Sequence, residues 1–236
     1  MPDHIERKGV RTIAFLHQHI LSLLLSLATL ATFLWLLLFR DRLRMTWPAA
    51  LGFSLLHVAV GLLFVSVFAF LEGAESGARS LFGAVFFMPA AYWLGAKLSK
   101  RQTADVFDIF AVCMIFTLFC ARVGCLFSGC CQGRMIHGLE PHRWPTRELE
   151  LVFYAIFLIL TVPKILKGQS GGKVYPSYMM AYGLTRGILE CFRESSTDSV
   201  FHLAHIWALL SLILGYVILT EINRHHRLSS GKRKTR

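Results

Sequence analysis

The feature that most constrains this chain is a set of long apolar stretches that contain no Asp, Glu, Lys or Arg. They run over Ile13–Phe39, Met45–Leu71, Ser80–Ala96 and Val200–Thr220. A helix of about 20 such residues is long enough to cross the hydrocarbon core of a bilayer. These four stretches therefore predict transmembrane helices. The first is longer than the apolar region of a signal peptide, so we expect it to be a span rather than a cleaved leader.

Three further apolar segments are interrupted by charge. Ile109–Ala121, Leu151–Pro163 and Val174–Thr185 are too short to cross a bilayer unless the charged residues beside them also lie within the helix. A charge inside the membrane costs at least a few kcal/mol, so it has to be paired or face a wet cavity. These interrupted segments are therefore where functional residues are expected.

Length and composition then set the fold class. The chain has 236 residues and 55% of them are hydrophobic, which excludes a disordered protein and a small disulfide-rich module. Seven spans take up about 140 residues and leave no room for a separate soluble domain. We predict an all-α integral membrane protein whose seven transmembrane helices occupy residues 1–223. Residues 224–236 are expected to form a basic cytoplasmic tail that contacts anionic membrane lipids rather than nucleic acid.

Loop charges predict the orientation of the helices. Lys and Arg are more numerous in the segments that seven spans place on the same side as the C-terminus. The positive-inside rule makes that side cytoplasmic, with the N-terminus outside. The segment 127–150 and the ends of the fourth and sixth spans are then expected on the outer face.

The sixth span carries a polar stripe. Tyr182, Arg186, Glu190 and Arg193 follow one another at spacings of four, four and three, so they share one face of a helix. The simplest interpretation is an Arg–Glu pair that neutralises itself within a helix bundle. Two guanidiniums against one carboxylate leave donors over, however, and such donors suit a phosphate or a carboxylate.

A second concentration of unusual residues follows the fourth span, in CARVGCLFSGCCQGR. It contains Arg122 and Arg134, glycines that permit tight turns and the close approach of a ligand, and four cysteines. The glycines are Gly124, Gly129 and Gly133, and the cysteines are Cys120, Cys125, Cys130 and Cys131. The cysteine spacing does not match the paired C-x-x-C of a structural zinc site, and His137 and His142 nearby change this little, so we expect no metal and no cofactor. A disulfide from Cys125 to Cys130 or Cys131 and simple buried packing remain the alternatives.

At this point the chain resembles a known family. ARVGCLFSGCCQGR is similar to the signature region of prolipoprotein diacylglyceryl transferase, in its cysteine-rich branch, and YGLTRGILECFRE is similar to the family's Tyr-Gly-x-x-Arg-x-x-x-Glu-x-x-Arg stretch. Asp108 falls where the family has an acid, and WPTRELE, Trp144 to Glu150, loosely follows the family's H-P-S-Q-L-Y-E. The resemblance covers roughly Asp105–Glu194.

The resemblance implies a transferase of the bacterial inner membrane with its active face outward. Such an enzyme moves the diacylglyceryl group of phosphatidylglycerol onto the lipobox cysteine of a lipoprotein precursor, whose signal peptide is the second partner. The product is a thioether, and the leaving group is glycerol phosphate. By the same resemblance the catalytic residues are Arg122, Arg186, Tyr182 and Glu190, and the substrate-binding residues are Gly124, Gly129, Gly133, Arg134 and Arg193. Fixed guanidiniums suit this chemistry because they stabilise charge on a departing phosphate without a metal.

One family motif is altered. The family's S-x-H-G-G reads SLFGA here, so Phe82 stands in the place of the histidine. His57, His202 and His205 are alternative proton acceptors, although a lone histidine on an apolar helix is more often a hydrogen-bonded core residue. Two other functions therefore stay open: a relative with lost or altered chemistry that binds lipid or serves as an accessory protein, and a membrane thiol–disulfide protein that uses Cys125, Cys130 and Cys131.

Overall fold

The computed structural model describes residues 3–73, 79–98, 100–139, 142–193 and 203–234, with side chains from residue 19 to residue 225. This part of the chain forms seven α-helices. They are α1 (Asp3–Leu38), α2 (Trp47–Leu71), α3 (Phe82–Leu98), α4 (Thr103–Ser128), α5 (Thr146–Leu166), α6 (Val174–Glu190) and α7 (Leu203–Lys234).

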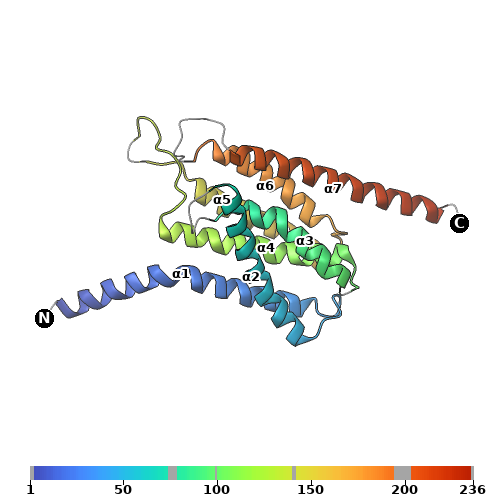
Figure 1. Cartoon of the computed structure of the whole chain (residues 1–236), viewed down its shortest axis with the longest axis horizontal. Coiled ribbons are helices and arrows are strands. Elements are labelled where there is room, and N and C mark those ends of the chain that lie inside the picture. The colour runs from blue at the N-terminus through green and yellow to red at the C-terminus, as the bar shows by residue number, and fades with distance from the viewer. Residues whose placement is uncertain (1–2, 74–78, 99, 140–141, 194–202, 235–236) are drawn as a thin grey trace.

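Most of the helices lie roughly along the long axis of the molecule with α4 in the middle, whereas α2 crosses them at a steep angle (Figure 1). α4 packs against α1, α3, α5 and α6, and α6 packs closely on α7. The chain termini lie at opposite ends of the bundle (Figure 1). We call the end with residues 129–139 and 191–193 the cysteine end, and the end with the turns 39–46 and 167–173 the turn end.

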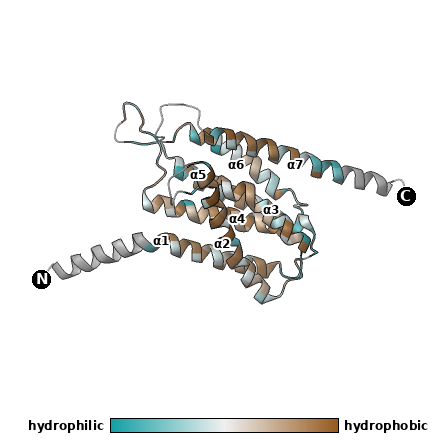
Figure 2. Ribbon diagram, in the orientation of Figure 1, coloured by the Kyte–Doolittle hydropathy of each residue, from teal (hydrophilic) through white to brown (hydrophobic). Residues whose placement is uncertain are grey.

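The structure confirms an α-helical membrane protein. Five described helical segments are long and apolar enough to cross a membrane: His19–Leu38, Trp47–Leu71, Thr103–Ser128, Thr146–Leu166 and Leu203–His225. Hydrophobic residues dominate the middle of the bundle (Figure 2). α3 and α6 have 17 residues each, or about 26 Å of helix, which is shorter than the hydrocarbon core. Seven crossings and the orientation of the termini therefore stay predictions.

The interrupted segments become full helices because their charged residues are buried within the bundle. α4 begins six residues before Ile109 and continues through Arg122, and α5 includes Glu150. Asp108, Arg122, Glu150 and Arg186 are all buried. The prediction that charges beside these segments lie within helices, turned away from lipid, is confirmed for these residues.

One of these charges fixes the start of α6. The backbone N–H groups of Gly172 and Val174 donate hydrogen bonds to the Asp108 carboxylate at 2.6 and 2.9 Å. Amides at a helix start have no partner within the helix, so a buried carboxylate stabilises them and is stabilised in return. Asp108 thus joins α6 to α4 at the turn end.

α6 and α7 approach closely because small residues face one another. A Cβ added at Gly183 would lie 2.5 Å from the carbonyl oxygen of Ala208, and one at Gly215 would lie 2.7 Å from that of Pro176. Glycines at such crossings let two backbones come together in a membrane bundle. α7 itself continues as a helix to Lys234, so the backbone of the predicted basic tail is helical up to that residue.

This packing predicts that Gly183→Ala destabilises the protein. The new Cβ would meet backbone atoms that cannot turn aside, so we expect a loss of about 1–3 kcal/mol. Gly187→Ala is the matched control, because its Cβ would lie an ordinary 3.6 Å from the Ala208 Cβ; that variant should keep or slightly gain stability. Thermal unfolding of the purified protein in detergent measures both, and equal unfolding temperatures would contradict the close contact.

Candidate active site

Three helices place charged side chains around one buried carboxylate. Arg122 on α4 forms an ion pair through Nε with Glu150 Oε2 on α5. Arg186 on α6 donates from Nη1 to Glu150 Oε1 at 2.5 Å. Two arginines that are far apart along the chain therefore meet at the same acid.

The group continues along α6. Arg186 Nη2 lies 2.8 Å from Glu190 Oε2, and Arg193 Nη1 lies 3.8 Å from the same oxygen. We call Arg122, Glu150, Arg186, Glu190 and Arg193 the arginine–glutamate group. It holds three guanidiniums and two carboxylates, which leaves one positive charge in excess.

The donors in this group are not equally occupied. Both terminal nitrogens of Arg186 are paired with carboxylates. Arg122 makes its ion pair with Glu150 through Nε, and no second carboxylate pairs with Arg122 among the described residues. Arg122 and the more loosely held Arg193 therefore carry the donors that remain for an anion.

Glu150 is a site residue that the sequence pattern alone does not single out. In the sequence, Glu150 is only a charge at the edge of the fifth span and the last residue of WPTRELE. The sequence did contain a signal for this residue, because Glu150 aligns with the final acid of the family's H-P-S-Q-L-Y-E motif. Helical periodicity could not predict that Glu150 on α5 contacts arginines on α4 and α6.

Three tyrosines border the group. Tyr154, Tyr178 and Tyr182 are buried, and their hydroxyls have no hydrogen-bond partner among the described residues. The rings of Tyr178 and Tyr182 lie 5.6 Å apart. A buried hydroxyl without a partner costs about 1–3 kcal/mol, which a bound polar ligand or water recovers.

Phe82 lies directly in this region. Its ring centroid is 5.5 Å from that of Tyr182 and 6.0 Å from the guanidinium carbon of Arg186. The position where the family has histidine is therefore beside the arginine–glutamate group. Phenylalanine there offers its ring face to a cation but cannot accept a proton.

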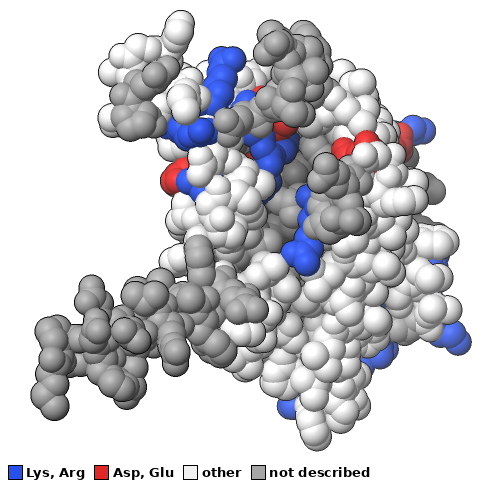
Figure 3. All heavy atoms as spheres, turned by 60° about the vertical axis from the view of Figure 1, so that its left-hand side comes forward, with Lys and Arg blue, Asp and Glu red and all other residues white. Residues whose placement is uncertain are grey.

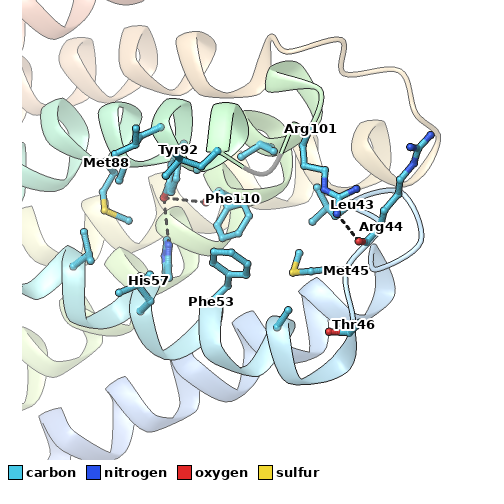
Figure 4. A pocket seen from close by; sticks show the side chains of 18 residues that line it. Leu43, Arg44, Met45, Thr46, Phe53, His57, Met88, Tyr92, Arg101 and Phe110 are labelled. Carbon is cyan, nitrogen blue, oxygen red and sulfur yellow. Dashed lines mark hydrogen bonds between the residues drawn. The ribbon is translucent and has the colours of Figure 1, made fainter.

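The alternative histidines that the structure describes lie elsewhere. His57 is buried 3.4 Å from the Tyr92 hydroxyl, and both line a cavity toward the turn end (Figure 4). His205 Nε2 lies 3.5 Å from Cys191 Sγ at the start of α7. His202 lies outside the described residues. The core interpretation therefore fits His57.

The three glycines predicted to bind substrate each have a structural reason. A Cβ at Gly124 would meet Leu21 of α1 at 3.3 Å, so this face of α4 is turned to α1. Gly129 ends α4 with a φ of 69°, which favours glycine. Gly133 lies so close to the backbone of Trp144 that any side chain would collide.

Of the predicted substrate-binding residues, Arg193 is the one that the structure brings into the arginine–glutamate group. Arg134 is exposed, and its guanidinium carbon lies 5.7 Å from the ring centroid of Phe192. The backbone around it is tied to the end of α6, because the Arg134 N–H donates to the Phe192 carbonyl at 2.9 Å. Basic side chains surround a hollow on the face seen in Figure 3.

The cysteines beyond α4 gather at one point. The sulfurs of Cys125, Cys130 and Cys131 all lie within 4.8 Å of one another, and all three are free thiols. The pKa of Cys131 is lowered, chiefly because Cys125 hydrogen-bonds to its sulfur, with Arg193 and Arg122 adding positive charge. The disulfide alternative is not formed in this structure.

An apolar helical bundle with buried, paired guanidiniums at one end defines an α-helical membrane protein with a charged group in its interior. Residues 49–221 match the family model of prolipoprotein diacylglyceryl transferase, so the chain belongs to that family. It is similar to a phosphatidylglycerol–prolipoprotein diacylglyceryl transferase of Clostridium tetani (strain Massachusetts / E88), with 21% identity over 162 residues. The matched part covers 62% of this chain and 65% of that relative, so slightly less than two thirds of the relative's length is spanned.

The shared carboxylate predicts a strong dependence of stability on Glu150. In Glu150→Gln two buried guanidiniums lose their common counter-charge, so we expect a loss of about 3 kcal/mol or more. Glu148→Gln is the matched control two residues away, because Glu148 is 45% exposed and pairs with Arg147 at 3.6 Å; it should change stability by less than about 1 kcal/mol. Thermal unfolding in detergent distinguishes the two, and a Glu150→Gln protein as stable as the control would exclude this role.

Proposed function

We propose that the protein transfers the diacylglyceryl group of phosphatidylglycerol to the lipobox cysteine thiol of a lipoprotein precursor. The observation that carries the proposal is the meeting of Arg122 and Arg186 at Glu150, in a buried group with one positive charge in excess. Such a group suits the single negative charge of a phosphodiester headgroup. Membership of the family supplies the reaction class.

The arginines have different roles in this proposal. Arg122 and Arg193 bind the phosphate oxygens, because their donors are the less occupied ones. Arg186 is held by Glu150 and Glu190, so it adds fixed positive charge and keeps both acids in place. Groups that are already oriented before the substrate arrives stabilise developing charge without reorganising. The hydroxyls of Tyr182 and Tyr154, which lack a hydrogen-bond partner among the described residues, donate to the same headgroup in this proposal.

The reaction balances without any oxidant or reductant. The sulfur of the precursor cysteine loses its proton and attacks the glyceryl carbon that carries the phosphate ester. A C–S bond forms, the C–O bond breaks, and the electron pair leaves with the phosphate oxygen as glycerol phosphate. Negative charge therefore grows on the phosphate in the transition state, where Arg122 and its neighbours stabilise it.

The same proposal sets the protein in the bacterial inner membrane. All seven helices cross the bilayer, and the cysteine end, with the arginine–glutamate group, faces the outer side. The turn end is cytoplasmic and carries basic residues in each of its turns, such as Arg40 and Lys167, as does the connection between α3 and α4 with Lys100. The basic tail, residues 224–236, adds attraction to anionic lipids.

Two observations support the two alternative functions, a lipid-binding relative and a thiol–disulfide protein. Phe82 removes a proton acceptor from beside Arg186, which favours a lipid-binding relative with altered chemistry. The clustered sulfurs of Cys125, Cys130 and Cys131 would also suit a thiol–disulfide protein. The first alternative requires bound phosphatidylglycerol without product, and the second requires loss of function when these cysteines become serine.

We expect Arg122→Gln to abolish transfer. The variant keeps a polar side chain but loses the charge that stabilises the leaving phosphate, so the rate should fall roughly 100-fold or more. The assay incubates purified protein in nanodiscs with phosphatidylglycerol and a lipobox peptide, and mass spectrometry detects the peptide carrying diacylglyceryl. Arg79→Gln, which removes an exposed arginine outside the group, should react normally.

The outcome separates the candidate functions. Product from the unaltered protein that persists in Arg122→Gln would contradict the proposed phosphate site. Binding of phosphatidylglycerol with no product, unchanged when Phe82→His restores the family residue, would instead support the lipid-binding alternative.

A further inference from the structure

Cys125, Cys130 and Cys131 lie close together, although their spacing in the sequence does not match the C-x-x-C pairs of structural zinc sites. Cys125 lies in the last turn of α4, and Gly129 then reverses the chain so that Cys130 and Cys131 return toward it. Cys131 has a φ of 59°, in the left-handed region, which costs energy for a residue other than glycine. The result is three sulfurs within 4.8 Å of one another.

These separations fit a metal ion better than a packing cluster. In a tetrahedral zinc site with Zn–S bonds of about 2.3 Å, neighbouring sulfurs lie about 3.8 Å apart. The three sulfurs therefore reach this geometry by small side-chain rotations. Cys130 is exposed, so the fourth position faces outward, and three protein ligands with one open position are typical of catalytic zinc. Thiolates select soft or borderline metals such as zinc.

The surrounding charge also suits such a centre. Zn²⁺ bound by three thiolates carries a net charge of −1. Arg122 lies one turn before Cys125 on the same face of α4, and the neighbouring arginine–glutamate group has one positive charge in excess. The hydroxyl of Ser128 also donates to Cys130 Sγ at 3.3 Å, which stabilises negative charge on that sulfur.

We propose that Cys125, Cys130 and Cys131 bind a zinc ion whose fourth ligand is the thiol of the lipoprotein precursor. This inference rests on the proposed function and deepens it. A metal-bound thiol is deprotonated outright, so its proton passes to water at the outer surface and no histidine is needed beside Arg186. The zinc-bound sulfur then attacks the glyceryl carbon, and the neutral thioether product is a weak ligand that leaves the metal.

This arrangement gives a reason for Phe82. A general base at position 82 would have to remove the proton from the precursor thiol, and Phe82 cannot do so. A metal that performs the deprotonation makes that base unnecessary. Phe82 then only packs on Tyr182 and Arg186, as the structure has it.

Metal content and a cobalt spectrum test the site without relying on transfer activity. The protein, purified under reducing conditions and supplied with Zn²⁺, should retain about one equivalent of zinc. Cys125→Ser and Cys131→Ser should lose it, whereas Cys191→Ser, an exposed cysteine at the same end of the molecule, should keep it. With Co²⁺ in place of zinc, a thiolate charge-transfer band should appear and change when a lipobox peptide is added, but not with its Cys→Ser version.

Each other outcome overturns one of the two ideas. The zinc site would be overturned if both cysteine variants kept their metal, or if the active protein contained a disulfide among these three cysteines. Full transfer by protein stripped with a chelator would overturn it too, and would leave the proposed function intact. Zinc and peptide binding with no product from phosphatidylglycerol would overturn the proposed function and leave the metal site.

A separate observation concerns the turn end. A cavity of about 550 Å³ lies between α2, α3, α4 and the turn after α1, within the range of small-molecule sites (Figure 4). Its walls are mainly apolar, including Phe53, Met88 and Phe110. None of the arginine–glutamate group lines it.

The mouth of this cavity is basic. Arg44 and Arg101 lie there, and Arg101 Nη2 donates to the carbonyl of Arg44 at 2.7 Å, which ties the two turns together. Neither guanidinium is paired with a carboxylate in the described part of the chain. An apolar cavity with two uncompensated guanidiniums at its mouth complements a lipid with an anionic headgroup.

We infer that this cavity binds an anionic phospholipid from the leaflet opposite to the arginine–glutamate group. One acyl chain enters between α2 and α3, and the phosphate lies at Arg44 and Arg101. This lipid is structural rather than a substrate, since the cavity contains none of the proposed reacting groups.

Native mass spectrometry of protein in mixed vesicle lipids, phosphatidylglycerol with phosphatidylcholine, tests the inference. One phosphatidylglycerol molecule should stay bound to the protein after delipidation. The fraction of protein that retains it should fall at least several-fold in Gly95→Phe. Gly95 lines the cavity and a Cβ there meets nothing within 4 Å, so the new side chain would enter the cavity. Gly52→Phe on α2, equally open but outside the lining, is the control. The double variant Arg44→Gln, Arg101→Gln should lose the preference for the anionic lipid, and a preference that survives in it would overturn the inference.

Discussion

The shared carboxylate of Glu150 is the interaction on which the rest of the structure depends. Arg122 and Arg186 are buried in an apolar helical bundle, where an uncompensated charge costs several kcal/mol. Neither arginine could stay buried unless α4, α5 and α6 met at one place. The apolar surfaces of these helices drive them into the bundle, but the charges decide how they are aligned within it.

The same constraint produces the candidate function. Two acids neutralise most of the charge of three arginines, which makes the group stable enough to persist without a ligand. The remainder is one positive charge, together with the donors of Arg122, which pairs with a single carboxylate among the described residues, and an anionic headgroup would use both. A fully neutral group would be more stable and would have nothing to offer a phosphate.

How much the sequence could predict depended on the range of each contact. The alignment of Arg186, Glu190 and Arg193 followed from helical periodicity, because it is local. Hydropathy alone ends each apolar segment at a charge, whether or not the partner of that charge lies on another helix, and only the cost of an unpaired charge in the membrane predicted the longer helices. Glu150 was missed for a related reason, and the gathering of Cys125 with Cys131 was anticipated only as the disulfide alternative. One needs a contact between helices, and the other needs a chain reversal at Gly129 that spacing rules for structural zinc do not include.

α6 is held along its whole length, and this bears on how the site would work. Asp108 binds its first amides, Gly183 sets it against α7, and Arg186 binds Glu150 near its end. A helix fixed at these three places cannot slide or rotate without leaving a buried charge or amide unpaired. The donors therefore keep their positions before a lipid arrives. That is the condition under which charged groups lower a reaction barrier rather than only bind a headgroup tightly.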